Sequence, residues 1–225
     1  MKKLLILGDY GSEGFHRFEG ADQVLADTLS GDFEVTLCAD YAGLTYDDLR
    51  QYALVISYCN EQWCDKTSQD LVAAILTYVV NGGCFLPLHF GGCLAKSLRT
   101  SPFERGGKQY ELCTLIGGRF TMQHPPYTVL EIYPVGDHPA NRGAVPFTIE
   151  EEPYVFDMGV FGDRTVLYEY KYGSKTIPAF WFDRFGKGLG AYLFIGHDRY
   201  ILSNENVKRM IRSFAVWAAG RSEEE

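Results

Sequence analysis

The stretch ALVISYC-NEQWCDKT-SQDLVAAILTYVV-NGG-CFLPLHF, residues 53–90, decides the fold class. Ala53–Cys59 and Cys84–Phe90 are continuous apolar runs, which are typical of strands that are buried on both faces. Between them, Ser68–Val80 repeats its apolar residues at helical spacing, and Asn81-Gly82-Gly83 is a typical helix stop. Two buried strands joined by a helix predict a parallel pair.

The same alternation extends from this unit in both directions. Toward the amino terminus, Lys3–Gly8 and Phe33–Cys38 are further strand patterns, and Ala21–Leu29 between them has helical spacing. Toward the carboxyl terminus, Gly190–Ile195 predicts a last buried strand and Asn204–Ala219 a closing helix. We therefore expect an α/β fold in which helices cover both faces of a mainly parallel sheet.

A different pattern fills the region between these parts. Tyr110–Ile116 predicts a short helix, and Thr128–Tyr133 alternates as a half-buried strand does. Thr165–Tyr170 and Ala179–Phe182 predict a hairpin around Tyr172-Gly173-Ser174.

Length and composition indicate one ordinary globular domain. The chain has 225 residues, of which 46% are hydrophobic and 22% charged, so a core of full size is available. No internal repeat or linker divides it, and we expect a single domain over residues 1–220 with a polar tail over residues 221–225. The net charge of −8 disfavours nucleic acid and anionic lipid as partners.

The sequence also predicts a cytoplasmic protein without a membrane partner. The apolar run after Lys3 stops at Gly8, whereas a signal peptide needs about 7–15 apolar residues and a membrane helix about 20. The six cysteines include no Cys-x-x-Cys pair, so most are expected to be buried free thiols. A homo-oligomer is left open.

Polar side chains gather where the predicted strands end. His16, Glu61, His89 and His197 each follow a predicted strand, and His124 lies in a loop that could return to the same place. Ligands of open parallel sheets bind at the carboxyl ends of the strands. We therefore expect these side chains around one crevice, flanked by aromatic rings that could lie against the C–H faces of a sugar, namely Tyr10, Trp63 and Tyr127.

Each polar candidate also has a structural explanation. His16 and Glu61 could be solvated surface groups, and His89 could be a core histidine bonded to the backbone. His197 could cap the segment that follows it, and His124 could belong to a proline-rich turn. The sequence contains neither a Gly-x-Gly-x-x-Gly fingerprint nor a Walker lysine motif, so no nucleotide cofactor is expected.

Six motifs follow one another along the chain: Tyr78–His89 (YVVNGGCFLPLH), Leu115–Phe120 (LIGGRF) with His124-Pro125, Gly136–Gly143 (GDHPANRG), Glu152–Asp157 (EPYVFD), Arg184–Gly188 (RFGKG) and Gly196-His197-Asp198. In this order they make the sequence resemble the ThuA-like (trehalose utilisation) family of the class I glutamine amidotransferase-like superfamily. The resemblance implies a flavodoxin-like three-layer sandwich.

The nucleophile of that superfamily is missing from this sequence. Amidotransferases carry a cysteine in a Gly-x-Cys-x-Gly elbow, and the matching run Pro87–Gly91 has His89 in its place. An imidazole cannot form the thioester that glutamine hydrolysis requires. The family's later catalytic histidine could correspond to His197, but the expected His-Pro-Glu is His197-Asp198-Arg199 here. The resemblance therefore does not extend to amidotransferase activity.

The resemblance implies a role in carbohydrate catabolism, with a small sugar or keto-sugar as the partner. Histidine and carboxylate groups suit acid-base chemistry next to a carbonyl, or they could hold a divalent metal ion such as zinc, manganese or iron. We interpret the catalytic residues as His89, His197 and Glu61, and the substrate-binding residues as His16, Tyr10, His124, Trp63 and Asp198.

Two other functions fit the same sequence. The fold could have kept a pocket and lost its chemistry, which would make the protein a sugar-binding or scaffolding protein. Alternatively, Cys93 or Cys59 could serve as the nucleophile of a thiol hydrolase, since Cys93 follows His89 by four residues.

Overall fold

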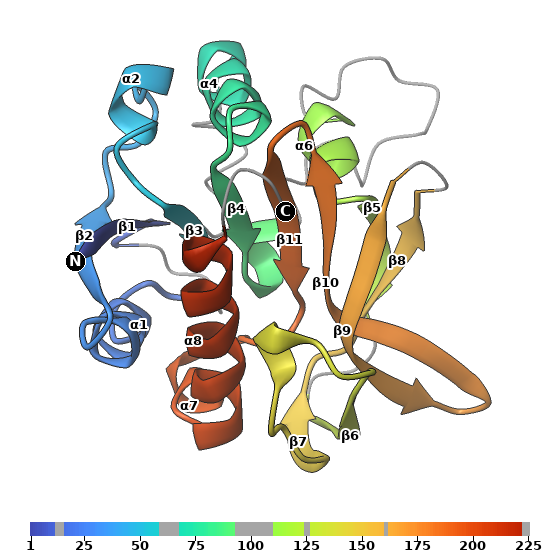
Figure 1. The fold of residues 1–225 in the computed structure, drawn as a ribbon. Coiled ribbons are helices and arrows are strands. Elements are labelled where there is room, and N and C mark those ends of the chain that lie inside the picture. Colours follow the sequence, from blue (N-terminus) through green and yellow to red (C-terminus); the bar gives the residue numbers. More distant parts are fainter. Residues whose placement is uncertain (12–15, 59–67, 93–109, 124–126, 160–161, 222–225) are drawn as a thin grey trace.

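The structure is a computed structural model that describes residues 1–11, 16–58, 68–92, 110–123, 127–159 and 162–221. Within these residues, nine strands form one sheet in the order β2-β1-β3-β4-β11-β10-β9-β6-β7, and β5 and β8 form a separate pair. Figure 1 shows the sheet crossing the molecule between two layers of helices.

The first half of the sheet is parallel and has the predicted architecture. Its strands are β2 (Phe33–Cys38), β1 (Lys2–Gly8), β3 (Leu54–Tyr58), β4 (Cys84–Pro87) and β11 (Gly188–Leu193). The order β2-β1-β3-β4-β11 is the flavodoxin-like order. Because all five strands run in one direction, their carboxyl ends lie along a single edge of the sheet. Side chains that follow these strands are therefore brought to the same edge.

The second half of the sheet is antiparallel. It consists of β10 (Lys175–Phe185), β9 (Arg164–Tyr172), β6 (Thr128–Pro134) and β7 (Phe147–Glu151). The predicted hairpin around Gly173 joins β9 to β10, and the positive φ of 60° at Gly173 is a conformation that glycine adopts without strain. The separate pair, β5 (Gly118–Gln123) and β8 (Tyr154–Met158), is also antiparallel.

Helices cover both faces of the parallel half, as the sequence predicts. One layer contains α2 (Tyr46–Leu49), α4 (Gln69–Val80) and α6 (Tyr110–Leu115), and the other contains α1 (Ala21–Leu29), α7 (Arg199–Leu202) and α8 (Glu205–Gly220). The described residues also contain two short 3-10 helices, η1 (His89–Gly92) and η2 (Pro139–Asn141).

Side-chain caps fix where the two longest helices begin. The Ser68 hydroxyl accepts a hydrogen bond from the Leu71 N–H at the start of α4, and the Asn204 side chain accepts one from the Asn206 N–H at the start of α8. Each bond satisfies one of the free N–H groups that open a helix.

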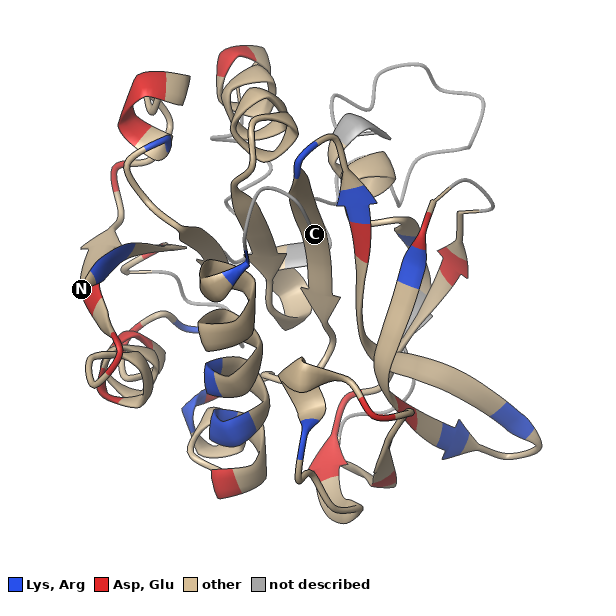
Figure 2. Cartoon of the chain, viewed as in Figure 1, with Lys and Arg blue, Asp and Glu red and all other residues tan. Residues whose placement is uncertain are grey.

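The core lies on both sides of the central strands. Figure 2 shows no charged residue on β3, β4 or β11, in keeping with their continuous apolar sequences. The closing helix α8 buries Val207, Ile211 and Phe214 against this core, as its spacing predicts. Cys84 and Cys113 are buried free thiols, whereas Cys38 is half-buried.

The predicted strand Cys84–Phe90 is shorter in the structure, because the chain turns sharply after Pro87. Leu88 donates its N–H to the Ser57 carbonyl, and His89 takes a φ of 46° to open η1. The turn presses Gly91 against β3, where an added Cβ would lie 2.4 Å from the Ser57 carbonyl oxygen. Strands β5, β7 and β8 were not predicted from the sequence.

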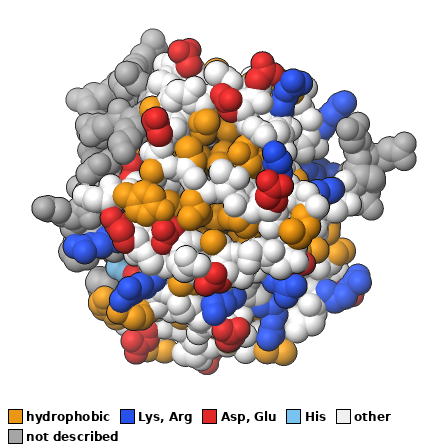
Figure 3. Space-filling view, turned by 90° about the vertical axis from the view of Figure 1, so that its left-hand side faces the viewer, with side chains coloured by type: hydrophobic (Ala, Val, Ile, Leu, Met, Phe, Trp, Pro, Cys, Tyr) orange, Lys and Arg blue, Asp and Glu red, His pale blue; other side chains and the backbone are white. Residues whose placement is uncertain are grey.

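The sheet has an open edge at β2. Figure 3 looks onto this side of the molecule, where apolar side chains gather among charged ones, and Leu37 of β2 is exposed. Among the described residues, every helix is too short or too polar to cross a lipid bilayer. Whether copies of the chain associate stays a prediction.

Candidate functional site

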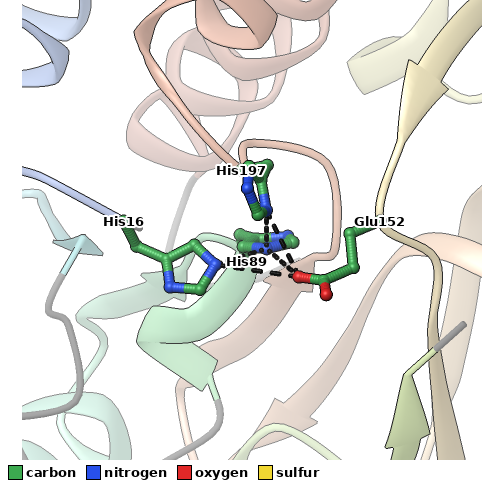
Figure 4. A group of neighbouring side chains, drawn as sticks. All are labelled: His16, His89, Glu152 and His197. Carbon is green, nitrogen blue, oxygen red and sulfur yellow. Dashed lines mark hydrogen bonds and ion pairs between the residues drawn. The ribbon is translucent and has the colours of Figure 1, made fainter. Parts of the chain in front are cut away.

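Four polar side chains from separate parts of the chain converge at the carboxyl edge of the parallel half. His16 follows β1, His89 opens η1 directly after β4, and His197 follows β11. Glu152 follows β7 and therefore comes from the antiparallel half. Figure 4 shows all four side chains pointing toward one another. We call these four residues the His/Glu cluster.

The cluster brings three ring nitrogens and one carboxylate oxygen around a common point. Nε2 of His89 lies 3.1 Å from Nε2 of His16 and 3.2 Å from Nδ1 of His197. Oε2 of Glu152 lies 3.2 Å from the His197 nitrogen, 3.5 Å from the His89 nitrogen and 3.8 Å from the His16 nitrogen. All four atoms lie within 4.8 Å of one another.

His89 is the most constrained member of the cluster. Its ring is fully buried and stacks on Tyr154, with ring centroids 4.2 Å apart. Its Nδ1 lies 2.6 Å from the Phe194 carbonyl oxygen, which can only accept a hydrogen bond, so Nδ1 carries the proton. Burial lowers the pKa of His89 to about 3, so the ring is neutral. Its Nε2 therefore directs a lone pair into the cluster.

Glu152 and His197 form the charged part of the cluster. Burial works against ionisation of Glu152, but its contacts with His16 and His197 outweigh this effect and hold the pKa of the carboxyl well below its usual range. Burial also works against a charge on His197, yet the hydrogen bond to Glu152 and the neighbouring carboxylates raise its pKa. The cluster thus contains a permanent carboxylate beside an imidazole that readily accepts a proton.

Glu151, the residue before Glu152, supports the cluster through hydrogen bonds to its backbone. Its Oε2 accepts hydrogen bonds from the N–H groups of Gly196 (2.8 Å) and His197 (3.3 Å), and its Oε1 accepts one from the N–H of Glu152 (2.7 Å). Burial raises the pKa of Glu151 to about 7. A single buried side chain therefore fixes the backbone of two cluster members, His197 and Glu152.

The structure brings together three of the residues that the sequence indicated, His16, His89 and His197. Tyr10 lies on the surface after β1, where its hydroxyl donates to Asp22 (2.7 Å). Asp198 caps α7, because its Oδ1 accepts hydrogen bonds from two N–H groups of that helix.

Several other predicted residues lie outside the described part of the chain, namely Glu61, Trp63, His124, Cys59 and Cys93. The roles assigned to all these residues from the sequence, and those of Tyr10 and Asp198, stay predictions.

The sequence matches the profile of the ThuA family, described as trehalose utilisation, over residues 9–218. The chain belongs to this family. Membership indicates a role in trehalose utilisation. Among curated proteins, no significant match is found.

Solved structures show the same fold. A ThuA-like protein from Bacteroides uniformis has a TM-score of 0.74 at 17% identity, covering 96% of this chain and 90% of that one. A ThuA-like protein from Parabacteroides merdae has a TM-score of 0.72 at 18% identity, covering 97% and 90%. A β-galactosidase from Rahnella sp. R3 has a TM-score of 0.67 at 15% identity, covering 96% of this chain and 31% of that one. At these identities the likenesses show the fold alone.

In this ThuA-family chain, His89 sits at a sharp turn directly after a buried strand. Its φ of 46° is in the left-handed region, which is strained for a residue other than glycine and is frequent at functional positions. The Tyr192 hydroxyl donates to the His89 carbonyl (2.9 Å), which helps to hold the turn. The correspondence of His89 to the cysteine elbow of amidotransferases, which the resemblance implies, stays a prediction.

Glu152 is the site residue of this ThuA-family chain that sequence reasoning did not select. It was noticed only as part of the motif Glu152–Asp157, because no strand was predicted before it and the carboxyl-edge rule applies only to parallel strands. One signal could have indicated it. Three imidazoles predicted at one edge of the sheet suggest a metal or acid-base site that also needs a carboxylate, and Glu152 is one of the few carboxylates within the six motifs.

Proposed function

We propose that the His/Glu cluster binds a divalent transition-metal ion and that the chain is a metal-dependent enzyme acting on a carbohydrate. One observation carries the proposal: the lone pair of His89 Nε2 points at two further ring nitrogens and a carboxylate oxygen, all within ligand spacing. A cation at the common point would give every one of these atoms a partner.

The distances within the cluster suit such an ion. Metal–nitrogen bonds of about 2.0–2.1 Å separate neighbouring ligands of a tetrahedral site by about 3.3–3.4 Å. Five of the six separations in the cluster run from 3.1 to 3.8 Å, and all six lie within 4.8 Å. Imidazole nitrogens favour zinc, iron or nickel, and a carboxylate also suits manganese. Because four protein ligands close a tetrahedral site, turnover favours an ion that accepts a fifth or sixth ligand from substrate.

The groups behind the ligands also fit a metal site. Metal-binding histidines generally donate their other ring N–H to a carbonyl or carboxylate, as His89 does to Phe194. Glu151 adds a buried carboxylate that fixes the backbone of His197 and Glu152. Such supporting contacts orient the ligands before an ion arrives.

The chemistry of the cluster fits a sugar that carries a carbonyl group. A bound metal ion would polarise that carbonyl as a Lewis acid. In the cluster without an ion, the carboxylate of Glu152 and the imidazole of His197 would instead exchange a proton with the sugar, since one is held ionised and the other has a raised pKa. His16, Glu152 and His197 keep 7–11% of their side-chain surface exposed, which leaves an approach for a small molecule.

The test is elemental analysis of the purified chain, followed by titration of the metal-free protein with Mn²⁺, Fe²⁺, Ni²⁺ and Zn²⁺. We expect about one ion per chain and a loss of most of this binding in Glu152→Gln and in His16→Ala. The matched control is His138→Asn, because His138 caps η2 away from the cluster and asparagine is a good cap.

A metal-free pairing is the competing arrangement, and the same experiment detects it. The N–H of His16 could donate to His89 Nε2, and the N–H of His197 could donate to Glu152, without any ion. If the purified chain holds no metal and the titrations show no saturable binding, the metal proposal fails. Turnover of trehalose or a keto-sugar that survives chelation would then assign the site to acid-base chemistry alone.

A further inference from the structure

Three aromatic side chains are largely exposed in the described part of the chain, Tyr10, Tyr127 and Tyr200. Two of them have structural partners. The Tyr10 ring packs on Phe18 and its hydroxyl donates to Asp22, and the Tyr200 hydroxyl accepts a hydrogen bond from Arg199. Tyr127 is 64% exposed, and its hydroxyl makes no hydrogen bond with any described residue. Within the described residues, hydrogen bonding therefore accounts for the first two rings and not for the third.

The backbone of Tyr127 points to a role outside folding. Its φ is 61°, and the other described non-glycine residue with a positive φ is His89 of the cluster. For a residue other than glycine this left-handed conformation is higher in energy than the usual ones, and residues strained in this way are frequent at functional sites. Because the Tyr127 ring is mostly exposed, its own burial does little to offset that strain.

The ring stands beside the cluster. Its centroid lies 6.3 Å from that of the His197 imidazole, with an angle of 65° between the two planes. His197 is one of the three cluster residues that keep exposed surface. The exposed Tyr127 ring and the exposed part of His197 are therefore neighbours at the surface of the cluster.

We propose that Tyr127 is a substrate-binding residue, a platform on which a sugar ring lies while its polar groups reach the cluster. The C–H groups of a pyranose form an apolar face that packs on an aromatic ring, and the phenol hydroxyl adds a hydrogen bond to the sugar hydroxyls. The ligand class is a cyclic saccharide, since an open-chain polyol offers no such face. The proposal deepens the proposed carbohydrate function and rests on it.

The experiment measures trehalose and maltose binding by calorimetry in four variants, with sorbitol as the open-chain comparison. Tyr127→Ala and Tyr127→Gly should each weaken disaccharide binding at least tenfold, and Tyr127→Phe should restore most of that loss. Tyr200→Ala is the matched control, because it removes an equally exposed tyrosine from α7. Tyr127→Gly should also raise the melting temperature above that of Tyr127→Ala, since glycine adopts the left-handed backbone without strain.

The outcomes separate this proposal from the metal proposal. Metal content is measured in every variant and should equal that of the wild type, so a loss of sugar binding cannot reflect a loss of the ion. Undiminished disaccharide binding by Tyr127→Gly, or wild-type binding of sorbitol as tight as that of trehalose, overturns the platform. A wild-type chain that binds neither disaccharide overturns it as well, whereas a chain without metal whose sugar binding still depends on Tyr127 overturns the metal proposal alone.

Discussion

The two edges of the parallel half hold their polar side chains in opposite ways. At the carboxyl edge, His16, His89, His197 and Glu152 are almost completely buried and point at one another. Three ring nitrogens and a carboxylate oxygen lie there within 4.8 Å of one another, an arrangement that a bound cation would account for.

At the amino edge several polar groups are cations, and the end of α8 accounts for two of them. The last carbonyls of a helix carry partial negative charge, which favours a cation beside them. Lys2 donates its Nζ–H to the Ala219 carbonyl near the end of α8, and Arg221 donates to the Ala218 carbonyl (3.3 Å). With Lys187, these cations line a hollow of about 300 Å³. The comparison shows that contacts within the protein can account for charged side chains at one edge of the sheet, whereas the cluster at the other edge lacks such an explanation.

The largest effect is expected from His89→Ala, which should remove both metal binding and stabilising contacts at the carboxyl edge. We expect metal affinity to fall by more than about 100-fold, beyond the range seen when supporting residues are lost. The fully buried ring would also leave a cavity and an unpaired Phe194 carbonyl, which costs about 2–4 kcal/mol in the free energy of unfolding. Urea denaturation and metal titration measure the two losses. Lys187→Ala, at the other edge, should change neither the metal affinity nor the free energy of unfolding. An equal loss in that variant would contradict the proposed difference between the two edges.

The second effect concerns Glu151, which should act on the site through the backbone of His197 and Glu152 and not through their metal-binding atoms. Glu151→Gln keeps the shape but turns one acceptor oxygen into a donor against the N–H groups it now binds. We expect metal affinity to fall by about 10–100-fold and the free energy of unfolding by about 1–3 kcal/mol. The comparison is with Glu152→Gln, which should lose more metal affinity and less stability. The reverse ranking would mean that Glu151 is itself the ligand.

The third effect is the pH dependence of metal binding. His197 has a raised pKa, so it remains protonated to a higher pH than an ordinary histidine and must release its proton to bind an ion. His89, whose pKa is lowered to about 3, and Glu152 are already in their binding forms at neutral pH. Affinity should therefore weaken by about tenfold per unit as the pH falls below the pKa of His197. Calorimetric titration between pH 8 and 5.5 tests this, and a flat profile contradicts it.

The smallest effect is expected at the amino edge. Lys2→Ala removes a cation from the carboxyl end of α8 and should lower the free energy of unfolding by about 0.3–1 kcal/mol. The loss should shrink when salt is added, because exposed charges are screened. Metal affinity should stay at the wild-type value. A change in metal affinity would show that the two edges are coupled through the sheet.

The sequence predicted the parallel half well, because its signals are local. Continuous apolar runs mark β1, β3, β4 and β11, and a helical spacing marks α4 and α8. The edge rule for parallel sheets then predicts that His16, His89 and His197 lie together.

The antiparallel half was predicted less well, for a physical reason. Strands β5, β7 and β8 are short and half-buried, so their register depends on partners far away in the sequence. Glu152 lies between two of these strands, and its place beside His89 depends on that pairing. Tertiary contacts of this kind leave little trace in the local pattern.

The cluster draws on four segments, at residues 16, 89, 152 and 197, and so ties both halves of the sheet together. An ion held by all four would act as a reversible crosslink, since it binds the folded chain and not the open one. At a free concentration of about 1,000 times its dissociation constant, such a ligand adds about 4 kcal/mol to the free energy of unfolding. Proteases that attack transiently opened chains would then spare the loaded protein. Metal supply would set how long each copy survives in the cell.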